Sequence, residues 1–363
     1  MNNNMFMHIY DARAISFGTD RNEELKKLRN DIVGAIRGEK KIRAPRFIMF
    51  KVTDRCNSGC IYCRYAYNKK YDHNLGTEKM TKEQFLEVLE QAAELGIEAI
   101  AFNGGEALMR EDIIELVHET VKRKILPIIM TNALLLEKYW DELGKIGVRY
   151  IIASFDTLDK EVFEEQRCVS YEKTLQGIES LNKMREKYGN VFVHITSVLT
   201  SKNLELMPQL VEYCNRNEMW IELSVYDTYN QTQDILSVSD ESKLKEFCEY
   251  MIQKKREGFY ISNADCYFEH LADFCIRKHR IPQNYKCYSG YGIVLLDNDL
   301  VVRPCWGHDV IGSLKHNILE ELWNNEKMEL VRKMMINGQC GGCWNLCTEF
   351  NSMCEALLER GDI

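Results

Sequence analysis

The sequence predicts an α/β protein, in which a partial (β/α)6 barrel is followed by a small α+β domain. Short β-branched runs alternate with amphipathic helical runs from Phe47 to Val225, as in parallel strands linked by helices. Six such units result, and they take fewer residues than the roughly 250 of a closed eight-stranded barrel. We therefore expect an open barrel of six strands.

The first predicted strand, Phe47 to Thr53, leads directly into a cysteine-rich loop. The helix after it begins at Thr81, where Gln84 completes a capping box. Its apolar residues recur with the helical period and therefore belong to the core. The remaining strands are expected at 99–102, 127–130, 150–154, 191–198 and 220–224, and the remaining helices at 111–124, 135–146, 171–188 and 206–215.

After Val225 the alternation of strands and helices ends. The elements expected here are a polar loop over 227–239, helices over 241–257, 264–279 and 318–335, and a hairpin over 292–305 with Asp-Asn-Asp at its turn. These changes predict four segments, namely an N-terminal extension over 1–45, the barrel over 46–225, a helical linker over 226–284 and a C-terminal domain over 285–363.

The composition is that of an ordinary soluble enzyme, with 45% hydrophobic and 28% charged residues among 363. A net charge of −8 argues against a nucleic-acid partner, because phosphate binding requires a basic surface. No run approaches the roughly 20 apolar residues of a membrane span. The N-terminus also lacks the basic start and apolar core of a secretory signal. We therefore expect a cytoplasmic protein with no nucleic-acid and no membrane partner.

Three cysteines, Cys56, Cys60 and Cys63, lie within eight residues in a CxxxCxxC arrangement. With 14 cysteines in the chain, chance would give about 0.02 such matches. Thiolates are the ligands of iron–sulfur clusters, and three of them leave the fourth iron of a four-iron cluster open to a small chelating molecule. The alternative is a zinc knuckle, which normally has four ligands in two CxxC pairs.

The CxxxCxxC motif, with Tyr62 before its last cysteine, resembles the signature of the radical S-adenosylmethionine (SAM) superfamily. The resemblance implies a partial barrel in which SAM chelates the open iron of a 4Fe–4S cluster, with Tyr62 beside the cofactors. One electron then cleaves SAM to methionine and a 5′-deoxyadenosyl radical, which removes a hydrogen atom from the substrate. An external electron donor, such as a flavodoxin or a ferredoxin, is implied as well.

The stretch Phe102-Asn-Gly-Gly-Glu106 follows the second predicted strand and resembles the Gly-Gly-Glu motif of that superfamily. The resemblance implies that the backbone of Gly104 and Gly105 and the carboxylate of Glu106 hold the SAM amino group. Two glycines let a backbone approach a ligand closely. Alone, such a motif is more often a turn, but sites on parallel barrels collect at strand C-termini. The superfamily usually continues with proline, where this chain has Ala107.

Two further strand ends carry polar residues. Thr131-Asn132-Ala133 resembles a Thr-Asn-Gly of the superfamily and is expected to be a wall of the site. Ser154-Phe-Asp156 resembles its Ser-Leu-Asp-Gly, which implies that Ser154 and Arg167 contact SAM, with Arg167 at the SAM carboxylate. The alternatives are ordinary strand-end polarity and a surface arginine. Asp156 is expected to face substrate or to cap the next helix.

The C-terminal cysteines Cys287, Cys305, Cys340 and Cys343 resemble the twitch or SPASM extension of one branch of radical SAM enzymes. The resemblance implies that these four ligate an auxiliary 4Fe–4S cluster, and structural zinc on the same four is the alternative. A SPASM domain with two clusters usually shows CxxCxxxxxCxxxC, whereas this chain has CxxCxxxC. We therefore prefer one auxiliary cluster to two, with Cys347 as a substitute ligand.

Spare cysteines suggest a further role, because a thiol near a carbon radical can donate a hydrogen atom and invert a stereocentre. Cys168, Cys214 and Cys248 are expected to pack as small hydrophobes. Cys266, just before the cluster domain, is the candidate hydrogen donor. His194, alone on the fifth strand, is expected to be a core residue rather than a proton carrier.

Together these features predict a radical SAM enzyme that acts on a C–H bond. The expected substrate is a ribosomally made peptide, modified by epimerisation, oxidation or crosslinking, because most SPASM and twitch relatives modify such peptides. The alternative is a twitch-type dehydrogenase or epimerase of an amino sugar or another small molecule. A third hypothesis is a non-catalytic electron-transfer protein, in which a three-ligand cluster and a Gly-Gly-Glu motif would have no use.

Overall fold

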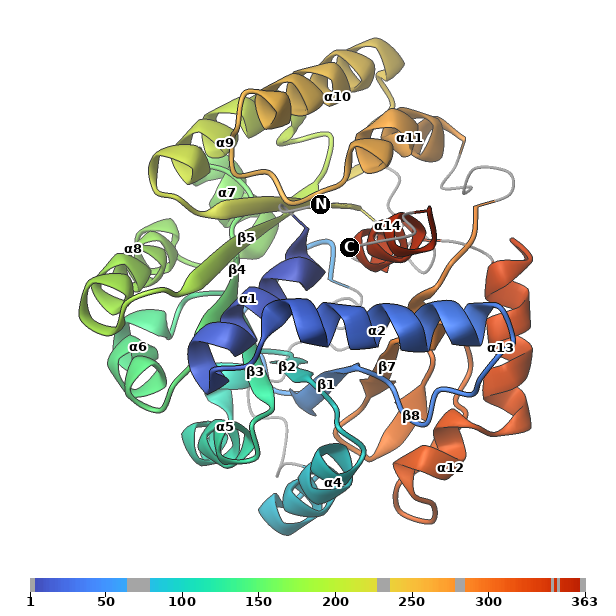
Figure 1. The fold of residues 1–363 in the computed structure, drawn as a ribbon. Coiled ribbons are helices and arrows are strands. Elements are labelled where there is room, and N and C mark those ends of the chain that lie inside the picture. The colour runs from blue at the N-terminus through green and yellow to red at the C-terminus, as the bar shows by residue number, and fades with distance from the viewer. Residues whose placement is uncertain are drawn as a thin grey trace.

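Six parallel strands form the centre of the structure, as the sequence predicts (Figure 1). The computed structural model describes residues 4–63, 79–226, 236–277, 285–340, 343–344 and 347–359. Each of these strands pairs in parallel with the next one along the chain. Their bounds are Phe47–Thr53 (β1), Ala99–Gly104 (β2), Leu126–Thr131 (β3), Tyr150–Ser154 (β4), Phe192–Leu199 (β5) and Trp220–Val225 (β6). The predicted partial (β/α)6 barrel is therefore confirmed.

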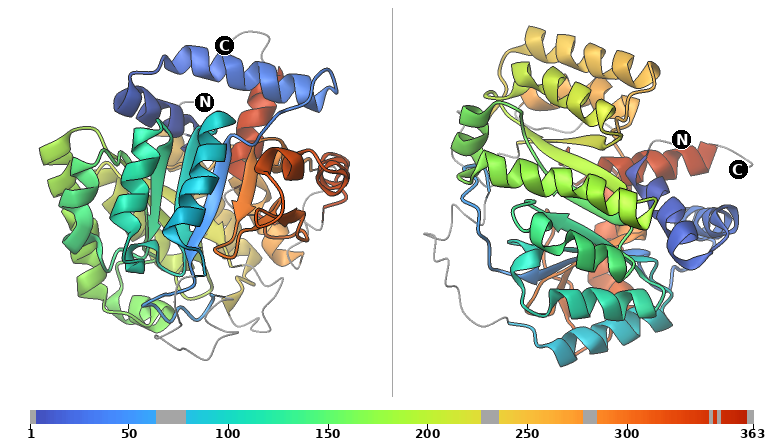
Figure 2. Two further views of the ribbon diagram at one scale, coloured as in Figure 1. Left: turned by 90° about the horizontal axis from the view of Figure 1, so that it is seen from below. Right: turned by 90° about the vertical axis from the view of Figure 1, so that its left-hand side faces the viewer.

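Helices cover the outer face of these strands (Figure 2). They are α4 (Lys82–Glu94), α5 (Ile113–Lys122), α6 (Leu136–Lys145), α7 (Lys160–Arg167), α8 (Tyr171–Tyr188) and α9 (Met207–Arg216). The predicted capping box of α4 is present, since Thr81 and Gln84 exchange hydrogen bonds between side chain and backbone. Helix α7 was not predicted, because its eight residues are too few for a clear apolar repeat.

The side chains of the strands alternate between two apolar clusters. From β1, Ile48 and Phe50 pack under the outer helices, whereas Phe47 points to the inner side. The inner cluster covers the N-terminal ends of the strands with three helices, α1 (Met5–Phe17), α2 (Arg21–Ile36) and α14 (Cys347–Glu359). Residues of the predicted N-terminal extension thus pack on the barrel.

Buried charges fix α1 to the start of the sheet. Glu98, just before β2, accepts hydrogen bonds from Tyr10 Oη at 2.6 Å and from Arg46 Nη1 at 3.0 Å. Arg13 donates to the Glu98 carbonyl at 2.6 Å and pairs with Glu24 of α2 at 2.7 Å. Because each of these charges has a partner, the attraction within the pairs offsets the desolvation penalty of burying them.

The C-terminal part extends the same sheet beyond β1. Strand β7 (Ile293–Leu296) pairs in parallel with β1, and β8 (Val301–Arg303) runs antiparallel to β7. The predicted hairpin over 292–305 is therefore confirmed. A short strand, β9 (Gly312–Ser313), pairs with β8 and completes a nine-stranded sheet.

The predicted helix over 318–335 is two helices, α12 (Leu319–Trp323) and α13 (Glu326–Ile336). The prediction of one continuous helix was wrong, because Asn325 is the N-cap of the second helix and therefore has a non-helical backbone. Its side chain accepts a hydrogen bond from the backbone N–H of Met328. None of the helices in the described part of the chain is long and apolar enough to cross a membrane.

Helix α14 bridges the β6 side and the β7 side of the barrel. Two helices, α10 (Glu241–Arg256) and α11 (Asp265–Ile276), precede it and follow β6. On that side Glu349 Oε1 of α14 accepts a hydrogen bond from Ala264 N, at the start of α11, at 2.9 Å. On the other side Phe350 packs so closely on Gly292 that a Cβ there would lie 2.2 Å from its ring. In Figure 1 α14 lies next to α11 accordingly.

Phe350→Ala should lower the free energy of unfolding by about 3–5 kcal/mol, because it empties a packed site. The Phe350 side chain is fully buried, and its ring centroid lies 5.2 Å from that of Phe6 and 6.2 Å from that of Phe47. Urea unfolding of the anaerobically purified protein measures the change. The control Leu330→Ala, at a side chain 60% exposed, should stay within about 0.5 kcal/mol. Equal losses would contradict the anchoring role of α14.

Candidate functional site

The cysteine loop, residues 54–63, follows β1 and rests on the last turn of α7. The backbone N–H of Gly59 donates to the carbonyl of Arg167 at 3.2 Å, and that of Ile61 donates to the carbonyl of Gln166 at 2.9 Å. The carbonyls at a helix C-terminus lack partners within the helix, so they are available as acceptors. The loop thereby has a fixed position at the C-terminal ends of the strands.

The Gly-Gly pair holds the end of β2 against this loop. The N–H of Gly105 donates to Thr53 O at 3.0 Å, and that of Glu106 donates to Arg55 O at 2.7 Å. A Cβ at Gly105 would lie 2.2 Å from Arg55 O. A Cβ at Gly104 would lie 2.5 Å from Thr53 O. The two glycines therefore allow the backbone at the end of β2 to lie directly against the cysteine loop.

The carboxylate of Glu106 ties the end of β2 to the end of β3. Its Oε1 accepts hydrogen bonds from Leu108 N at 3.0 Å and Thr131 Oγ1 at 2.8 Å, and its Oε2 accepts one from Asn132 N at 2.7 Å. Burial raises the pKa of Glu106, and these three donors oppose the shift. The carboxylate thus sets the relative position of two strand ends.

Asn132 links β3 to the cysteine loop, a contact that the sequence analysis missed. Its Nδ2 donates to Asn57 Oδ1 at 2.6 Å and to Ser58 Oγ at 2.7 Å. The next residue, Ala133, has φ 68°, a left-handed conformation that glycine adopts more easily. This conformation explains why a Thr-Asn-Gly pattern suits this turn. No local signal in the sequence pairs Asn132 with the loop.

Asp156 and Arg167 form a buried ion pair beside the cysteine loop. Arg167 Nε and Nη2 donate to the two carboxylate oxygens of Asp156 at 2.7 and 2.8 Å. Asp156 also accepts hydrogen bonds from Tyr62 Oη at 2.5 Å and from Val198 N at 2.9 Å. Arg167 is therefore a buried residue rather than a surface arginine. Ser154, two residues before Asp156, is half-buried at the end of β4.

The structure also separates the roles of Asp156 and Asp159 and defines that of His194. Asp159, rather than Asp156, caps α7, since its Oδ1 accepts a hydrogen bond from Val162 N.

His194 is a core residue, as predicted, and its Nε2 lies 3.1 Å from both His8 Nδ1 and Tyr150 Oη. Burial lowers the pKa of His194 well below its usual value, so the ring is neutral.

Two of the loop cysteines, Cys56 and Cys60, carry thiols in an environment that disfavours their ionised form. Burial raises the pKa of Cys56 to about 11 and that of Cys60 to about 12, and the charge of Cys63 adds to both shifts. A bound iron would therefore have to displace the thiol protons. In the described ranges no group of three cysteine, histidine or acidic side chains has a geometry that could hold a metal ion. The donor set itself is one that iron–sulfur clusters use.

Three of the C-terminal cysteines interact electrostatically although they come from distant segments. Burial raises the pKa of Cys305 to about 12, and the nearby charges of Cys287 and Cys340 add to the shift. His308 is an unpredicted neighbour, since its Nε2 lies 3.5 Å from Cys340 Sγ. In the sequence, the only indication that His308 lies near these cysteines is its position three residues after Cys305.

The remaining candidates are more dispersed. Cys343 is exposed, and the side chain of Cys347 lies outside the described residues. Cys354 is fully buried, and Cys287 is near enough to raise its pKa further. The sulfur of Cys266, on α11, lies 4.0 Å from Ser352 Oγ of α14.

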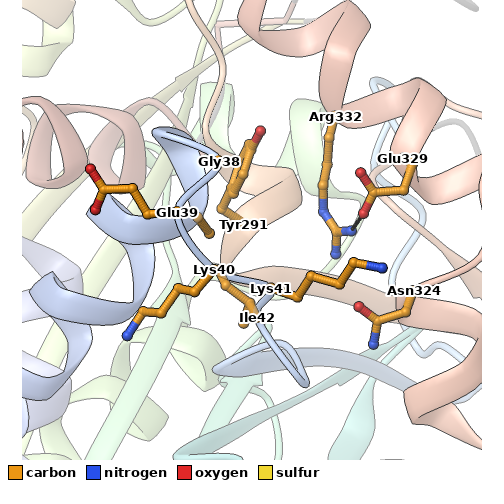
Figure 3. Close-up of a pocket in the computed structure, with 10 residues that line it drawn as sticks. Gly38, Glu39, Lys40, Lys41, Ile42, Tyr291, Asn324, Glu329 and Arg332 are labelled. Carbon is orange, nitrogen blue, oxygen red and sulfur yellow. Dashed lines mark hydrogen bonds and ion pairs between the residues drawn. The ribbon is translucent and has the colours of Figure 1, made fainter.

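A cavity of about 380 Å³ lies between the segment after α2 and the C-terminal part (Figure 3). Its lining includes Lys40, Tyr291 and Arg332. Lys40 is paired with Asp31, and Arg332 with Glu329, as the dashed line in Figure 3 marks for the second pair. Each pair therefore lies within one part of the chain, the first between α2 and the segment after it and the second within α13.

Comparison with known proteins gives consistent results. A model of the radical SAM superfamily matches residues 50–249, which is more than half of the chain. A GTP 3′,8-cyclase of Peptoclostridium acidaminophilum is 34% identical over 213 residues, or 56% of this chain and 63% of the relative. An AdoMet-dependent heme synthase of Methanosarcina barkeri is 24% identical over 341 residues, or 87% of this chain and 92% of the relative.

Among solved structures, SuiB of Streptococcus suis bound to its precursor peptide SuiA has a TM-score of 0.64 and 20% identity. The likeness covers 86% of this chain and 72% of SuiB, so it extends past the family match into the C-terminal part. The fold is thus that of a radical SAM barrel with a SPASM-type extension. Since the family match contains both the cysteine loop and the Gly-Gly-Glu stretch, the chain belongs to the radical SAM superfamily, whose cofactors are SAM and a 4Fe–4S cluster.

Proposed function

We propose that this enzyme removes a hydrogen atom from a ribosomally made peptide, in an oxidation, a crosslink or an epimerisation. The observation that carries the proposal is the cysteine loop, which hydrogen bonds fix to the ends of β2, β3 and α7. The cluster and SAM supply an electron and a 5′-deoxyadenosyl radical when they are bound. The protein's own residues hold, orient and enclose these groups.

In this proposal the loop cysteines Cys56, Cys60 and Cys63 are the iron ligands. Glu106, with the backbone of Gly104 and Gly105, sets the face on which the SAM amino group binds. Each oxygen of the Glu106 carboxylate has two lone pairs, so Oε2, which accepts one hydrogen bond, has room for a second. Ser154, Tyr62 and Arg167 line the other side, where the paired guanidinium of Arg167 offers its remaining N–H groups to the SAM carboxylate.

We propose further that an auxiliary 4Fe–4S cluster binds at Cys287, Cys305 and Cys340. The proximity of these three thiols supports it. Cys343 is the proposed fourth ligand, with Cys347 as its substitute. A second auxiliary cluster is the alternative, which the CxxCxxxC spacing favours less. An external flavodoxin or ferredoxin would supply electrons to the SAM-binding cluster.

The fold likeness to an enzyme solved with a precursor peptide supports a peptide substrate. A small-molecule substrate is the second candidate, and relatives named for GTP and for heme support it. If the reaction is an epimerisation, Cys266 is the proposed hydrogen donor. Anaerobic incubation with SAM and dithionite tests the reaction class, since 5′-deoxyadenosine must form.

Replacing Cys56, Cys60 and Cys63 together by Ala should abolish 5′-deoxyadenosine formation. The iron content of the reconstituted protein should fall from about eight to about four per chain, because only one of two four-iron clusters is lost. Cys168→Ala, at an exposed cysteine, is the control and should keep both the iron and the activity. Loss of all iron in the triple variant would contradict two separate cluster sites.

Glu106→Gln should weaken SAM binding by about 10- to 100-fold, since hydrogen bonds to a charged group contribute about 1.5–3 kcal/mol each. The amide N–H₂ group of the glutamine would also face N–H or O–H groups that now donate hydrogen bonds to the carboxylate, and it cannot accept those bonds. Calorimetric titration of the reconstituted enzyme with SAM measures the loss, while the cluster absorbance should stay unchanged. Glu111→Gln, at a side chain 92% exposed, serves as the control. An unaltered SAM affinity would remove Glu106 from the site.

A further inference from the structure

Glu222, in the middle of β6, is a fully buried carboxylate that stands apart from the other buried acids of the barrel. Neither of its oxygens has a hydrogen-bond partner among the residues that the structure describes. Other buried carboxylates are satisfied, since Glu98 and Asp156 each pair with an arginine and Glu106 accepts three hydrogen bonds. A buried, unpaired charge is costly to the fold. Glu222 therefore requires an explanation beyond stability.

The side chain of Glu222 points to the inside of the barrel. Its strand neighbours Ile221 and Leu223 both belong to the apolar cluster under the outer helices, and successive side chains alternate between the faces of a strand. In the sheet register Glu222 is paired with Thr196, and Thr196 is paired with Ser154. Glu222 thus ends a row of inward residues that begins at a proposed SAM contact.

Within the described ranges, the surroundings of Glu222 contain a second acid and a tyrosine hydroxyl but no free cation. Burial raises the pKa of Glu222 well above its usual value, and the charge of Glu349 on α14 raises it further. The hydroxyl of Tyr267 on α11, whose pKa Glu222 raises, is also buried without a partner among the described residues. Lys255, the cation near Glu349, is already bonded to Asp265 and to a backbone carbonyl.

Glu349 does not resolve this imbalance, because its own oxygens are in use. Its Oε1 accepts from Ala264 N at 2.9 Å, and its Oε2 accepts from Asn4 Nδ2 at 3.2 Å. Glu349 therefore joins three segments of the chain, and burial raises its own pKa to about 7, so it supplies no cation to Glu222. The inner wall at β6 consequently lacks a positively charged group in the part of the chain that the structure describes.

We infer that Glu222 binds a cationic group of the substrate, an ammonium or a guanidinium such as a lysine or arginine side chain of a peptide carries. This inference rests on the proposed function, in which the inside of the barrel receives the substrate. A cation would provide N–H donors for both carboxylate oxygens, and charge-assisted hydrogen bonds of this kind are the strong ones. It would also favour the ionised form of Glu222, which burial and Glu349 now disfavour.

Calorimetric titration of the reconstituted enzyme with SAM bound tests the inference through four probes. They are the N-acetyl, N-methylamide derivatives of lysine and arginine and their neutral analogues, norleucine and citrulline. At least one cationic probe should bind ten times more tightly than its neutral analogue, and the two pairs distinguish an ammonium from a guanidinium site. Glu222→Gln should abolish this preference. Glu205→Gln, at an exposed glutamate paired with Lys243, should leave it unchanged.

Equal affinities for the cationic and neutral probes, or a preference that survives in Glu222→Gln, would overturn the inference. The melting temperature of the probe-free variant gives a second readout. Glu222→Gln should melt at the same or a higher temperature than the parent, because it removes a buried acid that has no partner among the described residues, whereas a structural pair with Glu349 would make it melt lower. Formation of 5′-deoxyadenosine is measured separately. Its loss would count against the proposed function, and its retention with no cation preference would count against Glu222 alone.

Discussion

The close contact between the cysteine loop and the end of β2 is the constraint on which the rest of the site depends. The backbone of Gly105 is so near to Arg55 that a side chain cannot be accommodated there. This contact places the loop directly over the strand ends, where two more hydrogen bonds from Asn132 hold it. Three thiols on a short loop can share one cluster only if the loop keeps its shape. Cluster binding would therefore depend on the packing of the loop.

Buried charges do the remaining positioning, and most of them are satisfied within the protein. Glu106 joins two strand ends, and Asp156 joins Arg167, Tyr62 and the backbone of β5. Such groups hold a site rigid because each would be costly to separate from its partners. Glu222 differs from them in having no partner among the described residues, and that difference is the basis for assigning it a ligand.

The segments outside the barrel cover one of its two ends. Helices α1, α2 and α14 cover the N-terminal ends of the strands, and α14 also contacts the start of α11 through Glu349. The barrel is therefore closed at the end opposite to the cysteine loop. A substrate would enter from the side of the loop, where the sites of parallel barrels usually lie.

The sequence by itself determined the order of the six barrel strands and of most helices between them, because periodicity and capping are local properties of a chain. It also predicted a cluster-binding loop, since Cys56, Cys60 and Cys63 are neighbours in a CxxxCxxC arrangement. It could not determine that Asn132 holds that loop, or that Asp156 pairs with Arg167 instead of capping a helix. Those contacts join residues whose approach depends on how the strands align, and the same holds for Glu222 and Glu349, which only the closed fold brings together.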